Sequence, residues 1–202
     1  MPPKPKFTRE EITAAALKIA SDSGMKALTS RALGAALGSS ARPIFTVFKS
    51  MDEVAAEVHK AAMQKFDSYA EKAEGYFPYL KQIGLQMLLF AKEQPKLYRL
   101  LFMSENSQAE SFDDIFSGLG KTAVMCIESI QEEHGLTCEQ ANLLFRHLWI
   151  YTYGVGALIA TGACHFTENE IQDMLSREFS ALLMLIRSGK ADSCTIIPQK
   201  IL

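Results

Sequence analysis

Hydroxyl-bearing and basic side chains gather in one short stretch of this 202-residue chain. They are Thr29, Ser30, Arg31, Ser40, Arg42 and Thr46. The first three stand at the expected start of a short helix, where free backbone N–H groups and a cation suit a phosphate. The last three lie on a second short helix, and their donors and acceptors suit the edges of DNA bases. Arg42 is the natural reader of a guanine. The stretch therefore predicts contacts with double-stranded DNA.

Two short helices joined by a tight turn at Gly38 would position these side chains. Small hydroxyl residues precede each helix and are typical N-caps. Counted from a cap at Ser40, Pro43 falls in the first turn of the second helix, where its missing N–H costs no intrahelical hydrogen bond. Apolar anchors, Phe48 among them, would fix this second helix to the core while its polar face meets the DNA.

The rest of the chain shows helical spacing and no alternation typical of strands. Four capping-box pairs mark helix starts: Thr8 with Glu11, Ser50 with Glu53, Thr137 with Gln140, and Thr167 with Glu170. Helices are expected at about 8–23, 29–37, 40–48, 50–75, 78–92, 95–103, 111–134, 137–163 and 167–187. The predicted fold class is all-α, with an N-terminal helix-turn-helix head on a larger helical body.

Charge and composition divide the chain into a basic head and an acidic body. We expect a DNA-binding head over residues 1–58, an effector-binding and dimerisation body over 59–189, and a flexible tail over 190–202. Residues 1–60 carry nine Lys and Arg against six acidic residues, a net charge of +3. Because the whole chain has a formal charge of −2, the remainder carries −5. This asymmetry directs a polyanion to the head.

The head resembles the TetR/AcrR family of bacterial transcriptional regulators over about residues 8–58. The match consists of Ile12 with Ala15-Ala16, Gly24, Thr29-Ser30-Arg31, Leu37-Gly38-Ser39-Ser40, Ile44-Phe45, Val47-Phe48-Lys49-Ser50 and Asp52-Glu53-Val54. The resemblance implies a homodimer whose two heads read a palindromic operator. It also implies a body pocket for a small-molecule effector that lowers DNA affinity, and it places Lys49 against the DNA backbone. The body resembles the family only in length and helicity.

Three departures from the family pattern fall between residues 42 and 47. Phe45 stands where the family usually has Tyr, so that a phosphate-contacting hydroxyl is absent. Val47 replaces a frequent His, and Arg42 with Pro43 replaces a pair in which Gly is common. We hypothesise that Arg42 recovers the affinity that the missing hydroxyl would have supplied. The expected DNA-binding residues are therefore Thr29, Ser30, Arg31, Ser40, Arg42, Pro43, Phe45, Thr46 and Lys49.

The body offers large apolar side chains and a run of small ones. Its aromatic and Met residues are core residues by default, and a few are expected to line a pocket. The pocket candidates are Phe90, Phe102, Phe116, Met125, Trp149 and Tyr153. The small residues either weaken their helix or allow close packing in a two-fold four-helix interface, which we favour. The expected interface residues are Gly154, Ala157, Leu175, Phe179, Leu182 and Ile186.

Other classes of function find little support. The chain has no Gly-rich phosphate loop, His-Glu-x-x-His motif or nucleophile elbow, so neither an enzyme nor a cofactor is expected. The metal or thiol-sensor candidates are His147, Cys164 and His165, too few for a metal site. Four cysteines without close pairing favour reduced thiols and a cytoplasmic location. The uncharged run from Leu148 to Cys164 is short for a membrane span, and a helix buried at a subunit interface explains it better.

The leading hypothesis is therefore a dimeric transcriptional regulator that a ligand releases from DNA. A repressor is favoured over an activator. The alternative is a helical module that binds a small molecule or a protein partner without specific DNA readout. Affinity for DNA measured at two salt concentrations would separate the two.

Overall fold

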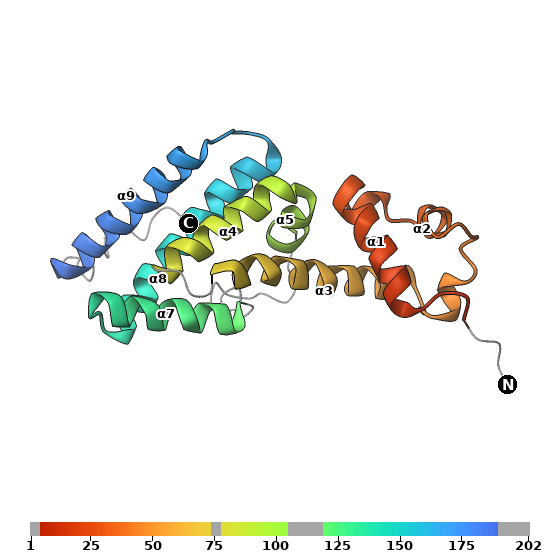
Figure 1. The fold of residues 1–202 in the computed structure, drawn as a ribbon, viewed down its shortest axis with the longest axis horizontal. Coiled ribbons are helices and arrows are strands. Elements are labelled where there is room, and N and C mark those ends of the chain that lie inside the picture. Colours follow the sequence, from red (N-terminus) through yellow and green to blue (C-terminus); the bar gives the residue numbers. More distant parts are fainter. Residues whose placement is uncertain (1–4, 74–77, 105–118, 190–202) are drawn as a thin grey trace, which may run out of the picture.

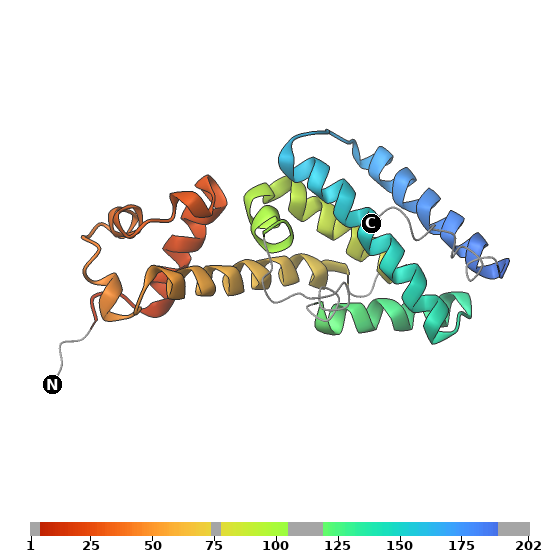
Figure 2. The ribbon, with the colours of Figure 1, turned by 180° about the vertical axis from the view of Figure 1, so that it is seen from behind.

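The computed structural model describes residues 5–73, 78–104 and 119–189, and the regular elements in these ranges are all helical. In the head lie α1 (Arg9–Ser23), η1 (Met25–Ala27), α2 (Ser30–Ala36), η2 (Ile44–Thr46) and the start of α3 (Met51–Ala70). In the body lie η3 (Glu71–Ala73), α4 (Tyr79–Glu93), α5 (Pro95–Phe102), α7 (Gly120–His134), α8 (Cys138–Thr161) and α9 (Glu168–Arg187). The molecule is elongated, and α3 runs from the head into the body (Figures 1 and 2). The predicted all-α class is confirmed.

Local capping sets most helix starts where the sequence predicts them. Thr8, Thr137 and Thr167 each accept the N–H of the residue three positions on, whose side chain bonds back to the threonine N–H. At α3 the exchange differs. Ser50 Oγ accepts the Glu53 N–H at 3.2 Å, but the Glu53 carboxylate accepts the N–H of the residue before Ser50, at 2.7 Å. Both bonds still satisfy backbone donors that the helix start leaves free.

The α-helix expected over residues 40–48 is wrong. The segment forms bends and the 3₁₀ turn η2, in which Phe45 N–H donates to Arg42 O and Thr46 N–H to Pro43 O, both at 3.2 Å. Proline has no N–H to donate, and its ring disfavours the α conformation at the residue before it. The i→i+3 turns nevertheless run through Arg42, because the Ile44 N–H donates to Ala41 O at 3.1 Å. Consecutive short turns thus take the place of a regular α-helix.

One apolar core runs through both parts of the molecule along α3. Val54 and Val58 are fully buried against the head, and Phe66 and Tyr69 are buried toward the body. The predicted boundary between residues 58 and 59 therefore falls inside one continuous helix. The residues of the expected 190–202 tail, and those before Leu119 in the helix expected over 111–134, lie outside the described ranges.

The helix α8 is the centre of the body and contacts α4, α5, α7 and α9. Among the described residues, it is the one helix long and apolar enough to cross a membrane, by length and composition alone. Its inward side chains, Leu144, Leu148 and Val155 among them, are buried in the body. Packing against four neighbouring helices accounts for the buried part of this composition, whereas Ile150 and Leu158 remain exposed.

Candidate nucleic-acid interface and ligand cavity

Residues 40–48 are called the reading segment below, and buried side chains fix this segment to the core of the head. Ile44 is fully buried, Phe48 is 1% exposed, and both belong to the main core. The turn before them has Gly38 in the left-handed region, at φ +63°. Such a backbone suits a glycine. The segment therefore has a fixed inner face, and its outer face is free to meet a ligand.

A second glycine, Gly34 of α2, allows the helix to touch this turn. A Cβ at Gly34 would lie 2.9 Å from both Ala41 N and Ser40 C, and 3.1 Å from Ser39 O. These are backbone atoms, which cannot rotate away as a flexible side chain would. Gly34 O also accepts the Ser39 N–H at 2.8 Å. Sequence reasoning did not single out Gly34, because only the packed turn shows the close approach.

Three cations of the head are exposed on or near the segment from Gly38 to Lys49. Arg31, Arg42 and Lys49 are exposed, and their side chains have no ion pair or hydrogen bond among the described residues. Lys6, from the chain before α1, donates to Ser39 Oγ at 3.1 Å and so adds a fourth cation beside the turn. Unpaired surface cations keep their full attraction for phosphates. The expected basic face is therefore present.

Two hydroxyl groups of the same stretch, those of Thr29 and Thr46, form hydrogen bonds with backbone groups of the protein. Thr29 Oγ1 accepts the Ala32 N–H at 3.1 Å and caps α2. Thr46 Oγ1 donates to Pro43 O at 2.6 Å, which occupies its only proton. Ser40 is exposed, whereas Ser30 and Pro43 are half-buried. Arg42 and Ser40 are thus the groups of the reading segment that can still donate to a base.

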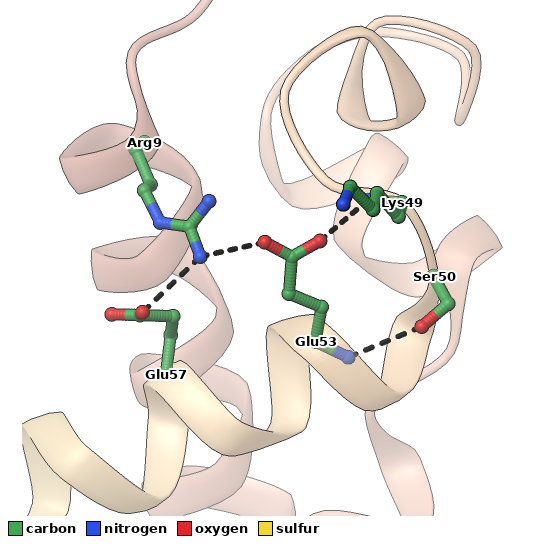
Figure 3. Close-up of polar contacts among 5 residues, drawn as sticks. All are labelled: Arg9, Lys49, Ser50, Glu53 and Glu57. Carbon is green, nitrogen blue, oxygen red and sulfur yellow. Dashed lines mark hydrogen bonds and ion pairs between the residues drawn. The ribbon is translucent and has the colours of Figure 1, made fainter.

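An ion-pair network fixes the start of α3 beside the reading segment (Figure 3). The Arg9 guanidinium donates to Glu53 at 2.8 Å and to Glu57 at 3.1 Å, and it lies 4.3 Å from the Phe48 ring centroid. The Lys49 N–H and the Arg9 guanidinium lower the pKa of Glu53, in that order of effect, because both bonds favour the carboxylate. The same carboxylates raise the pKa of Arg9. The sequence does not reveal Arg9, whose partners lie more than forty residues away.

Polar contacts join the head to the body at the α4–α5 junction. Gln94 Oε1 accepts from Ser21 Oγ of α1 at 2.8 Å and from Lys65 Nζ of α3 at 3.1 Å. Beside it, Lys96 Nζ donates to Asp22 O at the end of α1. One amide oxygen therefore links the α4–α5 junction to α1 and α3, while the backbone N–H of Gln94 caps the C-terminal end of α4 by donating to Phe90 O at 2.8 Å.

A cavity of about 250 Å³ lies among α4, α7, α8 and α9. Most of its walls are apolar, and Gly84, Met87, Trp149 and Leu175 contribute to them. Its other lining residues are Pro78, Leu80, Lys81, Ile83, Ser129, Ile130, Glu133, His134, Phe145, Leu148, Thr152, Ser176, Phe179 and Ser180. Apolar walls with a few polar groups are typical of small-molecule sites.

Three polar residues of this cavity lie near the end of α7, and the others, Lys81, Thr152, Ser176 and Ser180, come from α4, α8 and α9. Ser129 Oγ donates to Glu133 Oε1 at 2.5 Å, and His134 Nε2 lies 3.8 Å from Glu133 Oε2. The second carboxylate oxygen of Glu133 has no hydrogen-bond donor within reach among the described residues. An ionised carboxylate has about four acceptor positions, so this group retains capacity for a donor on a ligand.

Of the predicted pocket residues that the structure describes, Trp149 lines the cavity, and Phe90, Phe102, Met125 and Tyr153 are not among its lining residues. Phe90 is fully buried, and it stacks edge-to-face with Phe66, which contacts Phe102 in the same way. Tyr153 is tied to Phe102 O through its hydroxyl at 2.5 Å. Met125 packs against the core elsewhere, and Phe116 lies outside the described residues. Phe90 and Phe102 join α4 and α5 to α3 through Phe66, and all four residues pack in or against the main core. A role of these four in ligand binding stays a prediction.

The predicted dimer residues divide into exposed and buried ones. Gly154 is exposed and Ala157 half-buried, as an interface residue of a single chain should be. Leu175 and Ile186 are 7% and 4% exposed and pack inside their own chain, so little of either side chain is left for a partner, and their place in an interface stays a prediction. Phe179 and Leu182 are half-buried against the same core. The apolar side chains that α8 and α9 do expose are Ile150, Leu158, Met184 and Leu185.

The metal and thiol candidates are scattered over the surface. Cys164, His165 and His147 are exposed, and no three His, Cys, Asp or Glu side chains of the described ranges lie close enough together to hold a metal ion. Cys126 is buried in the core, and burial raises the pKa of its thiol to about 12. None of these groups forms a site with the cavity or with the reading segment.

Comparison with known proteins identifies the fold. No protein-family model and no curated protein matches the chain. Among solved structures, a transcriptional regulator from Rhodococcus sp. Rha1 superposes with a TM-score of 0.65 at 17% identity, covering 88% of this chain and 97% of that one. A TetR-like transcriptional regulator from Rhodococcus sp. RHA1 gives 0.62 at 18% identity, with coverages of 90% and 96%. A single-residue variant of TetR from Acinetobacter baumannii AYE, in complex with minocycline, gives 0.57 at 19% identity, with coverages of 91% and 98%. The fold that the head predicts, that of TetR-like regulators, is confirmed over nearly the whole length.

Proposed function

From this TetR-like fold, we propose that the chain is a dimeric DNA-binding transcriptional regulator and that it carries out no catalytic step. The observation that carries the proposal is the outer face of the head. There Arg31, Arg42 and Lys49 are exposed, without an ion pair to any residue that the structure describes, around a segment whose inner face is buried. Arg42 donates to a guanine edge, and Arg31 and Lys49 hold phosphates on either side.

Dimerisation is supported by an uncovered apolar face on α8 and α9. Ile150, Gly154 and Leu158 follow at intervals of four on α8 and are all exposed. On α9, Met184 is 74% exposed. Helices with residues at this spacing present one stripe, and two copies can pair such stripes about a two-fold axis. A two-fold dimer would read a palindromic operator with heads one helical turn of DNA apart.

An effector is supported by the cavity among α4, α7, α8 and α9. Its shape and lining suit a small, mainly apolar molecule that brings a hydrogen-bond donor to Glu133. The helix α4 runs from this cavity, at Gly84 and Met87, to its C-terminal cap at Gln94. A ligand that moves α4 would therefore act on the contact of Gln94 with the head. The ligand can release DNA only if it binds the conformation that does not bind DNA more tightly than the conformation that does. A chain released from DNA in this way would be a repressor.

The test is a selection of duplexes from a random pool, followed by measurement of Kd at two salt concentrations. We expect enriched duplexes with related half-sites and affinity that falls steeply with salt. Arg42→Ala should lower affinity for the enriched duplex by about 1–3 kcal/mol, roughly 5- to 150-fold. Lys121→Ala is the matched control, because it removes one exposed cation from the body instead of the head.

Two results would contradict the proposal. The first is the enrichment of no duplex, or binding no tighter than to random duplex. In that case the cavity favours the second candidate, a small-molecule binding module that retains the fold without DNA readout. The second is an equal loss of affinity in Arg42→Ala and Lys121→Ala, which would show that net charge, not the reading segment, binds the DNA.

A further inference from the structure

Phe45 is an aromatic side chain on the outside of the reading segment. It is 47% exposed, and it is the one aromatic among the large exposed apolar side chains of the described residues. The residue before it, Ile44, is fully buried, and Phe48, three positions on, is 1% exposed. The short turn therefore directs two apolar side chains to the core and leaves the third, Phe45, on the outer face.

The turn holds Phe45 in a defined position. Its N–H donates to Arg42 O at 3.2 Å, and the next residue is fixed twice, through the Thr46 N–H and the Thr46 hydroxyl, both to Pro43 O. The proline ring restricts the backbone further. A side chain on such a turn keeps its direction relative to Arg42, so that the two residues meet neighbouring positions of one surface.

The chemistry of a phenyl ring limits what it can contact on DNA. It has no donor, so it cannot replace a tyrosine hydroxyl at a phosphate. In the major groove, the 5-methyl group of thymine is the apolar group that distinguishes a base pair, and Phe is among the residues that contact it. The exposed cations around Phe45 bring the duplex to this surface.

We propose that Phe45 determines operator specificity by packing its ring on the 5-methyl group of a thymine, next to the guanine read by Arg42. The inference rests on the proposed DNA-binding function and adds a second base to each half-site. A buried methyl group contributes ~0.8 kcal/mol, which corresponds to about a fourfold change in Kd for each half-site.

The experiment replaces thymine by uracil, which differs only by that methyl group, at one position of the enriched duplex at a time. We expect one position per half-site at which uracil weakens binding of the unaltered protein about fourfold. In Phe45→Ala the affinity for the thymine duplex is lower and the preference for thymine over uracil at that position is lost. Phe45→Leu keeps an apolar side chain and should retain part of the preference. Far-ultraviolet circular dichroism verifies that both variants fold, as expected for an exposed position.

The outcomes separate this inference from the function on which it rests. If no duplex is enriched, the DNA-binding proposal fails, and the thymine contact fails with it. If a duplex is enriched but no uracil position weakens binding, only the thymine contact is overturned. The thymine contact is also overturned if Phe45→Ala loses affinity equally for the thymine and uracil duplexes, because the preference for thymine then persists without the ring.

Discussion

The substitution Gly34→Ala tests how the reading segment is held in place. The added Cβ would lie 2.9 Å from two backbone atoms of residues 40 and 41, about 0.5 Å inside ordinary contact. Overpacking of this kind costs about 1–3 kcal/mol, and the upper end applies here because backbone cannot rotate aside. The alanine returns about 1 kcal/mol of helix propensity. We therefore expect a net loss of about 2 kcal/mol in the free energy of unfolding.

Gly84→Ala is the matched control for this experiment. Gly84 also lies inside a helix, but a Cβ there would meet nothing closer than 3.5 Å, an ordinary contact. Its propensity gain of about 1 kcal/mol should therefore appear as increased stability. Urea unfolding measures both variants, at one protomer concentration because dimerisation would add to stability. Equal or increased stability of Gly34→Ala would refute the close approach of α2 to the turn, as would unchanged DNA affinity if the fold is retained.

Two further predictions concern the body and the network at α3. A Cβ at Gly156 would overlap the Tyr98 hydroxyl and lie 2.6 Å from its Cζ, so Gly156→Ala should lose about 1–3 kcal/mol in urea unfolding. Gly154→Ala, two residues away with nothing within 4 Å, should not, and equal effects would contradict this packing. Glu53 has a lowered pKa through the Lys49 N–H and the neighbouring guanidinium. Its stabilising effect is therefore present above the pKa of the unfolded chain and is lost as pH falls through the folded-state value. The difference in stability between the unaltered protein and Glu53→Gln should shrink toward low pH, and a difference constant with pH would exclude the carboxylate as its source.

The sequence predicts those parts of the fold that depend on neighbouring residues. The capping boxes at Thr8, Thr137 and Thr167 form as expected, because each needs only residues within one turn. The failure over residues 40–48 is also local. Placing Pro43 in a first helical turn accounts for its missing N–H, but it neglects the restriction that its ring places on Arg42. Both effects can be read from the sequence, and the structure has consecutive i→i+3 turns here in place of an α-helix.

The candidate sites depend on tertiary contacts, and the sequence predicts them unevenly. Most of the predicted DNA-binding residues are exposed, because polar type and exposure go together in the head. In the body, an apolar side chain is expected only to avoid water, so the sequence does not distinguish Phe90, a core residue, from Trp149, which lines the cavity. Leu175 and Ile186 show the same ambiguity, because an apolar stripe on α9 first meets the core of its own chain. Arg9 needs α1 and α3 to pack before its partners come within reach.

The glycines inside helices are of two kinds: those that close packing requires and one that packing does not require. Gly34 and Gly156 are required by the atoms that touch them, a backbone turn and a tyrosine ring. Gly84 is different, because its space would admit a methyl group and its place in α4 costs about 1 kcal/mol relative to alanine. The volume that it leaves open belongs to the cavity among α4, α7, α8 and α9. A residue that weakens its helix and enlarges a cavity favours binding at the expense of stability, which is the expected balance at a functional site. If a ligand occupies this cavity, Gly84→Ala should therefore raise stability and lower ligand affinity in the same variant.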